Sequence, residues 1–298
     1  MTAQIIDGKQ IAADMRAELK AEVAKLKTQN IVPGLGVILV GEDPASQSYV
    51  TAKERACDDM GIYSDDNRMP ADTSQADLMV LVKKMNNDKK INGILVQLPL
   101  PKGLNESEVL LAIDPAKDVD GFHPMNVGKM VVGEQAFLPC TPHGIIQLLV
   151  RSGVKIEGAE VVIVGRSNIV GKPLMNMLVQ KKSMANATVT VCHTRTKDLS
   201  YHTKRADIVI AAAGRPNTVT ADMVKDGVVV IDVGVNRVED ATKKKGYRLV
   251  GDVDFEAVKE KASLITPVPG GVGPMTITML LYNTVESAKR AAGIDSAS

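Results

Sequence analysis

Aromatic residues are scarce in this chain of 298 residues, which contains no tryptophan, five tyrosines and three phenylalanines. Proteins that bind single-stranded nucleic acids stack the bases on aromatic rings, so this class of protein is disfavoured. A charge excess is also lacking, because 36 lysines and arginines face 35 aspartates and glutamates, a formal net charge of +1. A nearly neutral chain lacks the basic surface that phosphate backbones require. Nucleic acid is therefore not an expected partner.

Cysteine is rare as well: Cys57, Cys140 and Cys192 are the three present, and no Cys-x-x-Cys pair occurs. An odd number of distant cysteines argues against a disulfide framework or a cysteine-based zinc site, and is typical of a reducing compartment. No apolar run approaches the ~18 residues needed to cross a membrane. The first ten residues contain no signal-peptide core. We therefore expect a cytoplasmic protein that acts on small molecules, with no membrane contact.

The length is sufficient for two domains at a typical ~150 residues each. Strands and helices are predicted to alternate along the whole chain, which favours mostly parallel sheets covered by helices. We predict two α/β domains, formed by residues 1–140 with 276–298 and by residues 141–275. Glycine, proline and aspartate are frequent in 114–134, which is predicted to be a loop. The predicted helices are 9–28, 45–60, 74–87, a short helix that begins at 105, 141–152, 171–183 and 276–292; the predicted strands are 35–40, 93–98, 161–164, 188–192, 207–211, 228–232 and 263–265.

The segment VVIVGRSNIVGKP, residues 161–173, is typical of a strand, a tight turn and a helix. Gly165 would let the chain leave the strand sharply, and Gly171 would let helix and strand approach each other. Free N–H groups at the helix start can face a phosphate. The pattern meets the Gly-x-Gly-x-x-Gly fingerprint only in part, so a plain strand-to-helix turn is the alternative. Small residues at 211–216 and 232–236 would leave room for a flat ligand, or would simply pack.

The choice between NADP and NAD depends on the end of the next strand. NAD-binding units place an acidic residue there to hold the ribose 2′-hydroxyl. Here the strand continues into His193, Thr194 and Arg195 without a carboxylate, and Arg166 lies in the first turn. A guanidinium binds a 2′-phosphate well, so the sequence predicts NADP. The alternative is that both arginines are solvated surface charges.

A second group of residues in the first half indicates chemistry. Tyr49 and Lys53 are four residues apart on a predicted helix and therefore share a face. Lysine serves in proton transfer when burial or a nearby cation lowers its pKa. Gln97 precedes the two prolines of QLPLP and should lie at the carboxyl edge of a sheet. A core tyrosine with a surface lysine is the alternative interpretation of the pair.

Two loops add to this group. The segment KDVDGFHP, residues 117–124, carries two carboxylates, and PVPGGVGP, residues 267–274, is rich in proline and glycine and should allow close approach. His123 and His143 lie beside prolines without partners at metal-ligand spacing, so we expect no metal site. Cys57 has no feature of a reactive thiolate and is expected to pack.

Six segments together resemble one family. YVTAK, QLPLP, KDVDGFHP, PCTP, VVIVGRSNIVGKP and PVPGGVGPMT occur in the order found in bifunctional methylenetetrahydrofolate dehydrogenase/methenyltetrahydrofolate cyclohydrolases. The resemblance covers nearly the whole chain, from Ser46 to Thr276. It implies two α/β domains flanking a cleft, the second a Rossmann-like doubly wound parallel sheet, and a homodimer formed through that nucleotide domain.

The resemblance also implies an activity and a set of residues. The activity is NADP-dependent oxidation of 5,10-methylenetetrahydrofolate to the methenyl compound, and hydrolysis of that compound to 10-formyltetrahydrofolate in the same site. Residues 1–140 with 276–298 would then be the catalytic domain and residues 141–275 the NADP-binding domain. The implied catalytic residues are Lys53, Tyr49 and Gln97; the implied folate-binding residues are Asp120, Tyr49, Pro269, Gly270 and Gly271; the implied NADP-binding residues are Gly165, Arg166, Ser167, Ile169, Gly171, His193, Thr194 and Val235.

Two other functions are compatible with part of this pattern. One is an NADP-dependent dehydrogenase of another small substrate, such as shikimate or quinate, although that chemistry gives no reason for QLPLP and PVPGGVGP. The other is a non-catalytic NADP-binding regulator, which the joint presence of Tyr49, Lys53 and Gln97 disfavours.

Overall fold

The structure is a computed structural model that describes residues 2–243 and 246–294. Its contacts divide the chain into a first unit, Asp14–Cys140 with Ile277–Ser298, and a second unit, Met1–Ala13 with Thr141–Thr276. The predicted boundary after residue 140 coincides with this division. Residues 1–13 do not follow the prediction, because strand β1 (Gln4–Ile5) pairs with a strand of the second unit.

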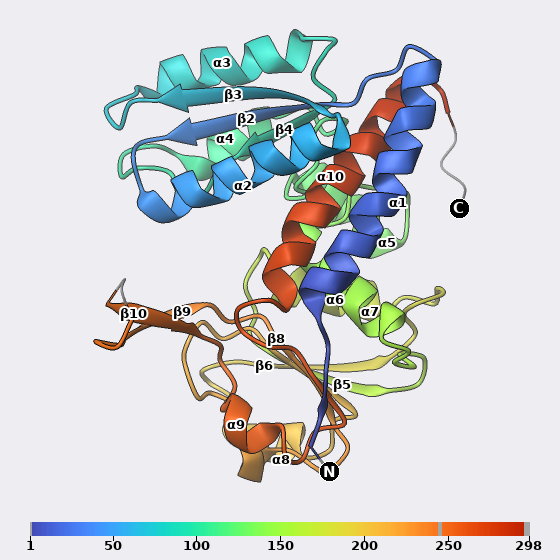
Figure 1. Cartoon of the computed structure of the whole chain (residues 1–298), viewed down its shortest axis with the longest axis vertical. Coiled ribbons are helices and arrows are strands. Elements are labelled where there is room, and N and C mark those ends of the chain that lie inside the picture. The colour runs from blue at the N-terminus through green and yellow to red at the C-terminus, as the bar shows by residue number, and fades with distance from the viewer. Residues whose placement is uncertain (1, 244–245, 295–298) are drawn as a thin grey trace. The chain divides into compact units, whose positions relative to one another are not determined.

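The first unit contains a parallel sheet of three strands in the order β3-β2-β4. All seven residues of the central strand are buried, as its apolar sequence predicts. Strand β3 was not predicted, because YSDDNRM is mostly polar; these side chains suit a strand at the edge of a sheet. Figure 1 shows the three strands between helices α3 and α2. The strands are β2 (Gly34–Val40), β3 (Tyr63–Met69) and β4 (Gly93–Val96).

Three helices of the first unit begin after a residue whose side chain caps them. Asp43, Ser74 and Asn105 each accept a hydrogen bond from a backbone N–H in the first turn. Helix α5 was missed, since it lies within the predicted loop 114–134; Pro124 is its first residue and His123 Nδ1 accepts from Met125 N. The helices are α1 (Gly8–Thr28) and α10 (Val272–Ala291), which both cross the division, and α2 (Pro44–Met60), α3 (Gln75–Asn87), α4 (Glu106–Ala112) and α5 (Pro124–Val132).

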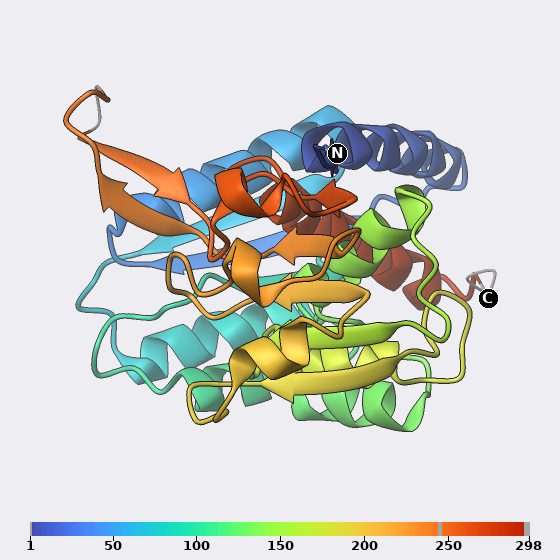
Figure 2. The same cartoon turned by 90° about the horizontal axis from the view of Figure 1, so that it is seen from below.

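The second unit is built on a sheet of six parallel strands in the order β1-β11-β8-β7-β5-β6 (Figure 2). The chain passes from β5 outward to β6 and then to β7 on the other side of β5, so the strand order reverses at β5. A reversal of this kind defines a doubly wound sheet, and ligands bind at the carboxyl ends of the strands beside it. The predicted Rossmann-like fold is confirmed. The strands are β5 (Glu160–Val164), β6 (Thr188–Cys192), β7 (Ile208–Ala211), β8 (Val229–Asp232) and β11 (Leu264–Ile265).

Short helices and one hairpin complete the second unit. The antiparallel hairpin of β9 (Asn236–Glu239) and β10 (Tyr247–Val250) was not predicted and extends away from the sheet in Figure 1. Helix α7 ends at Leu178, before the predicted 183. Within the described residues no helix is both long and apolar enough to cross a membrane. The helices are α6 (Cys140–Arg151), α7 (Gly171–Leu178), α8 (Leu199–Thr203), α9 (Phe255–Val258) and the 3₁₀ turn η1 (Ala221–Met223).

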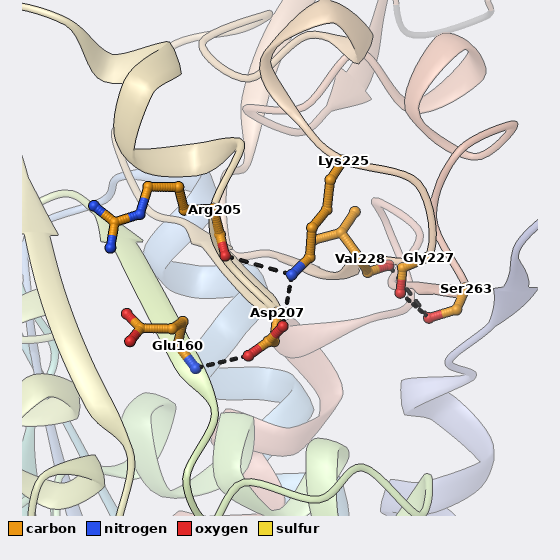
Figure 3. Close-up of polar contacts among 7 residues, drawn as sticks. All are labelled: Glu160, Arg205, Asp207, Lys225, Gly227, Val228 and Ser263. Carbon is orange, nitrogen blue, oxygen red and sulfur yellow. Dashed lines mark hydrogen bonds and ion pairs between the residues drawn. The ribbon is translucent and has the colours of Figure 1, made fainter.

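A polar cluster ties together the amino ends of the strands in this sheet (Figure 3). The Asp207 carboxylate accepts from Glu160 N at 2.9 Å and from Lys225 Nζ at 2.6 Å, and the Lys225 ammonium also donates to Arg205 O. Ser263 Oγ donates to Gly227 O at 2.7 Å. These bonds hold the edge of the sheet opposite to the carboxyl ends where a ligand would bind.

Candidate active site

Lys53 and Gln97 are in direct contact in the first unit. The Lys53 side chain lies on α2, is only 7% exposed and donates from Nζ to Gln97 Oε1 at 2.9 Å. Gln97 follows β4 directly, and its Nε2 donates to Leu98 O at 2.8 Å. This second bond fixes the orientation of the amide, so its oxygen faces the amine. The two residues therefore form an oriented amine–amide pair at the carboxyl edge of the sheet.

The electrostatics at Lys53 favour an uncharged amine. Burial lowers the pKa of Lys53, while the nearby charge of Asp120 partly opposes this effect. Sequence reasoning required burial or a cation for such a shift, and the packing of α2 supplies the burial. A lysine whose pKa is lowered can take part in proton transfer near neutral pH.

Asp120 is the charged neighbour of this lysine. Burial raises the pKa of Asp120, whereas the Lys53 charge and a hydrogen bond from the Cys140 thiol lower it. Cys140 is itself buried, and its Sγ also lies 3.4 Å from Val119 O, a second acceptor for the same thiol proton. Burial is the main cause that raises the pKa of this thiol well above the usual range. Its thiol therefore remains protonated and serves as a donor. Sequence reasoning quoted Cys140 within PCTP but assigned it no contact.

The loop that carries Asp120 is fixed on both sides. Asp118 is buried and accepts from Phe122 N at 3.2 Å, His123 N at 2.8 Å and Asn126 Nδ2 at 2.8 Å. Burial raises the pKa of Asp118 to about 6, although these hydrogen bonds act against the shift. From α10, Asn283 Nδ2 donates to Val119 O at 2.8 Å. Sequence reasoning assigned no role to Asp118 or to Asn283.

Two further residues of α2 flank Lys53 at intervals of one turn. Tyr49 is 44% exposed, so it is not the core tyrosine of the alternative interpretation. Cys57 is fully buried, and burial raises its pKa to about 12, so it packs as a protonated thiol. The helix thus combines an accessible phenol, a buried amine and an inert thiol.

Two glycines shape the turn after β5 in the second unit. Gly165 has a φ of +137°, and a Cβ at this position would overlap Ala212 O. Gly171 begins α7, and a Cβ there would overlap Gly165 O. Only glycine fits both positions. As the sequence indicates, the chain leaves β5 sharply at Gly165, and the start of α7 comes close to the strand at Gly171. The turn lies beside the strand reversal, where doubly wound sheets bind their ligands.

Three segments that carry the implied NADP-binding residues leave this carboxyl edge. Ser167 Oγ accepts from Val170 N at 3.1 Å in the loop after β5, and Thr196 N donates to His193 O at 2.8 Å in the turn after β6. Val235 follows β8 and is 55% exposed. The structure therefore places at one edge Gly165, Arg166, Ser167, Ile169, Gly171, His193, Thr194 and Val235.

Pro269, Gly270 and Gly271 belong to the second unit, in the loop between β11 and α10. Gly270 has a φ of +108°, and a Cβ at Gly271 would come within 2.7 Å of Pro267 O. The implied folate-binding residues are thus divided between the units, since Tyr49 and Asp120 belong to the first.

The two histidines that lie beside prolines, His123 and His143, have structural environments. His123 caps α5, and burial lowers the pKa of His143 to about 4, so its imidazole is neutral. Among residues 2–243 and 246–294, no three His, Cys, Asp or Glu side chains are grouped to hold a metal ion.

Comparison with known proteins connects both units to one family. Residues 6–120 match the catalytic domain of tetrahydrofolate dehydrogenase/cyclohydrolase, and residues 139–292 match its NAD(P)-binding domain. The Bifunctional protein FolD of Syntrophus aciditrophicus is 60% identical over 99% of this chain and 100% of its own length.

Solved structures agree with this comparison. The bifunctional FolD methylenetetrahydrofolate dehydrogenase/cyclohydrolase of Campylobacter jejuni is 49% identical, with a TM-score of 0.91 over 97% of this chain and 99% of its own. The Trypanosoma brucei enzyme, solved with NADP cofactor and an inhibitor, is 40% identical, with a TM-score of 0.92 over 98% of this chain and 99% of its own. This chain therefore belongs to the tetrahydrofolate dehydrogenase/cyclohydrolase family.

Proposed function

We propose that this protein oxidises 5,10-methylenetetrahydrofolate with NADP and hydrolyses the methenyl product to 10-formyltetrahydrofolate, with Lys53 as the central catalytic residue of both steps. The observation that carries the proposal is the buried Lys53 amine, held at 2.9 Å by Gln97 and close to Asp120. Membership of the family supports the two activities, and the solved relative with NADP supports the cofactor.

NADP, when bound, accepts the hydride that leaves the one-carbon bridge of the folate. Gly165 and Gly171 would suit the pyrophosphate of NADP, because a turn without side chains at these positions lets backbone N–H groups approach a phosphate closely. Arg166 would bind the 2′-phosphate, since it is exposed in this turn and a guanidinium forms paired hydrogen bonds with phosphate.

Hydrolysis of the methenyl product requires water to attack its cationic amidinium carbon and a group that accepts a proton. An uncharged Lys53 amine would assist the attack of water and accept a proton, and the positive product would lower its pKa further. Gln97 keeps the amine aimed. The Asp120 carboxylate would accept from the amino group and ring N–H of the pterin, a match of two donors to one carboxylate. Tyr49 would contribute its exposed ring to the folate site.

A spectrophotometric assay tests the two activities. Methylenetetrahydrofolate with NADP should yield NADPH, and the absorbance of the methenyl compound should then decay by hydrolysis. NADPH formation from shikimate or quinate but not from the folate would favour another dehydrogenase. Binding of NADP without turnover of any of these substrates would favour a non-catalytic regulator.

Replacing Arg166 with alanine should weaken NADP much more than NAD. Loss of a charge-assisted hydrogen bond costs ~1.5–3 kcal/mol, so the KM for NADP should rise about tenfold to a hundredfold while that for NAD changes little. Arg195→Ala, another exposed arginine after the neighbouring strand, is the matched control and should have a smaller effect. An equal loss for both cofactors in Arg166→Ala would rule out the assigned role.

Replacing Asp120 with alanine should weaken folate binding and leave NADP binding unchanged. The variant removes the carboxylate that accepts from the pterin, so the folate KM should rise at least about tenfold. Initial rates give the KM, and fluorescence titration gives the dissociation constant of the nucleotide. Asp59→Ala, an exposed aspartate on α2, is the control. A defect in nucleotide binding of the same size would count against the assignment.

The homodimer is also part of the proposal. Strand β6 pairs with β5 on one side and forms the edge of the sheet in the described part of the second unit. An edge strand with free N–H and C=O groups can pair with a second copy. Sedimentation velocity should show a dimer, and a monomer across the concentrations of the activity assay would contradict this part.

A further inference from the structure

Two buried carboxylates lie at the carboxyl edge of the second unit and have no part in the mechanism above. Asp232 is the last residue of β8 and is 2% exposed, and Asp252 follows β10 and is 0% exposed. No lysine or arginine forms an ion pair with either carboxylate in the described part of the chain. A buried carboxylate without a cation must be stabilised by hydrogen-bond donors. The donors therefore identify the backbone segments that each carboxylate fixes in place.

The donors to Asp252 come from the segment that follows β7 and from the first residue of β9. Its Oδ2 accepts from Ala213 N at 2.6 Å and from Gly214 N at 2.8 Å. Its Oδ1 accepts from Asn236 Nδ2, at the start of the hairpin, at 2.9 Å. One carboxylate therefore joins the exit of β7 to the first residue of β9.

The donors to Asp232 come from the segments that follow β8 and β10. Its Oδ1 accepts from Gly234 N at 3.0 Å and from Asp252 N at 2.9 Å, and its Oδ2 accepts from Val253 N at 2.9 Å. Asp232 thus accepts a hydrogen bond from the backbone of Asp252, and the Asp252 side chain in turn accepts from the segment that follows β7. The position of this segment therefore depends on both carboxylates.

The backbone at Gly234 and Gly251 approaches the pair closely. A Cβ at Gly234 would overlap the Asp252 carboxylate, and a Cβ at Gly251 would overlap the Asp232 carboxylate. The backbone is therefore packed directly on the two carboxylates, which leaves these strand exits little freedom to shift while both side chains are in place.

The segments held in this way border the dinucleotide site. Ala212, which precedes the first donor to Asp252, packs its carbonyl against Gly165 in the turn after β5. Gly234, a donor to Asp232, precedes Val235, one of the implied NADP-binding residues. A dinucleotide in a doubly wound sheet lies across the carboxyl ends beside the strand reversal, and these exits form part of that surface.

We propose that Asp232 and Asp252 are positioning residues for the dinucleotide, and that they act by fixing the backbone at Ala213–Gly214 and at Gly234–Val235. The inference rests on the proposed function, because it assumes that NADP binds at this edge. Neither side chain is expected to touch the reacting atoms. Their effect should therefore fall on NADP binding and not on hydrolysis of the methenyl compound, which uses no dinucleotide.

The test is Asp252→Asn, which keeps the size of the side chain but replaces one of the two accepting oxygens with an NH₂ group, so that the donors to that oxygen lose their acceptor. The expected result is a rise of at least about tenfold in the KM and in the dissociation constant for NADP, the factor that corresponds to ~1.4 kcal/mol. The cyclohydrolase rate should remain that of the wild type. The matched control is Asp207→Asn, which changes a carboxylate of the same sheet that accepts from Glu160 N at the amino edge (Figure 3). It should leave NADP binding unchanged.

Unchanged NADP binding in a folded Asp252→Asn protein would overturn the inference, and so would equal losses of both activities. If Asp252→Asn does not fold, Asn236→Ala removes one donor and keeps both carboxylates; it should raise the dissociation constant for NADP in the same direction, and no rise would overturn the inference. The dissociation constant also separates the two proposals. A wild type that binds NADP but does not oxidise the folate would refute the proposed function, while the variants would still test the positioning role.

Discussion

Lys53→Met should abolish hydrolysis of methenyltetrahydrofolate while the fold survives. Methionine has nearly the length of lysine and is apolar, so it can occupy the buried space on α2 without leaving a cavity. The variant loses the amine that Gln97 holds and, with it, proton transfer at the site. Loss of general acid–base catalysis costs about 10²–10⁴-fold in rate, so we expect a fall of this size or more. Decay of the methenyl absorbance measures it.

Two controls separate a catalytic loss from a structural one. Lys84→Met changes an exposed lysine on α3 and should leave both activities intact. Circular dichroism and thermal melting should show that Lys53→Met is folded. In the wild type, hydrolysis should slow as the pH falls and the Lys53 amine takes up a proton, and this dependence should vanish in any residual activity of the variant. Retention of most hydrolysis by Lys53→Met would defeat the assignment.

Gly165→Ala should remove NADP-dependent oxidation and spare hydrolysis. At a φ of +137° an alanine is strained, and its methyl group would overlap Ala212 O. The turn after β5 must then move, and β5 is where the strand order reverses. Backbone strain of ~1–3 kcal/mol together with the lost close approach should raise the dissociation constant for NADP by about a hundredfold. Titration with the nucleotide measures the loss.

Gly158→Ala is the matched control. This glycine also has a positive φ, +74°, but a Cβ there would meet nothing within 4 Å, and it precedes β5 instead of following it. The control should share the cost of backbone strain without the loss of NADP. If the two variants bind NADP equally well, the close approach at Gly165 is not what the nucleotide requires.

The fold could be predicted where local chemistry decides it. Ser74 and Asn105 cap the helices that the sequence places after them, and the apolar runs form buried strands. Strand β3 was missed because an edge strand can be polar, and α5 because its N-cap is a histidine instead of the usual serine or aspartate. Strand β1 was missed because two residues carry no periodic signal, and its position depends on a distant partner.

The site could be predicted only in part for the same reason. The spacing of Tyr49 and Lys53 follows from the helix, and Gln97 from the end of a strand. The contacts of Cys140, Asp118 and Asn283 join segments that are remote in sequence, so no local pattern reports them. The roles proposed for Asp120 and Val235 rest on the resemblance to a family, since spacing alone does not distinguish one loop residue from another.

The pairing of Gln4 with Leu264 has a consequence for how the chain is made. Strand β1 leaves the ribosome long before its partner β11, because 264 − 4 = 260 positions separate the paired residues along the chain. Until then β1 has no neighbour, and β11 meets it as the last addition to the sheet. A recombinant fragment that starts at residue 139 would lack this outer strand, so β11 would have exposed N–H and C=O groups along one side. Such a fragment should aggregate more readily than the whole chain.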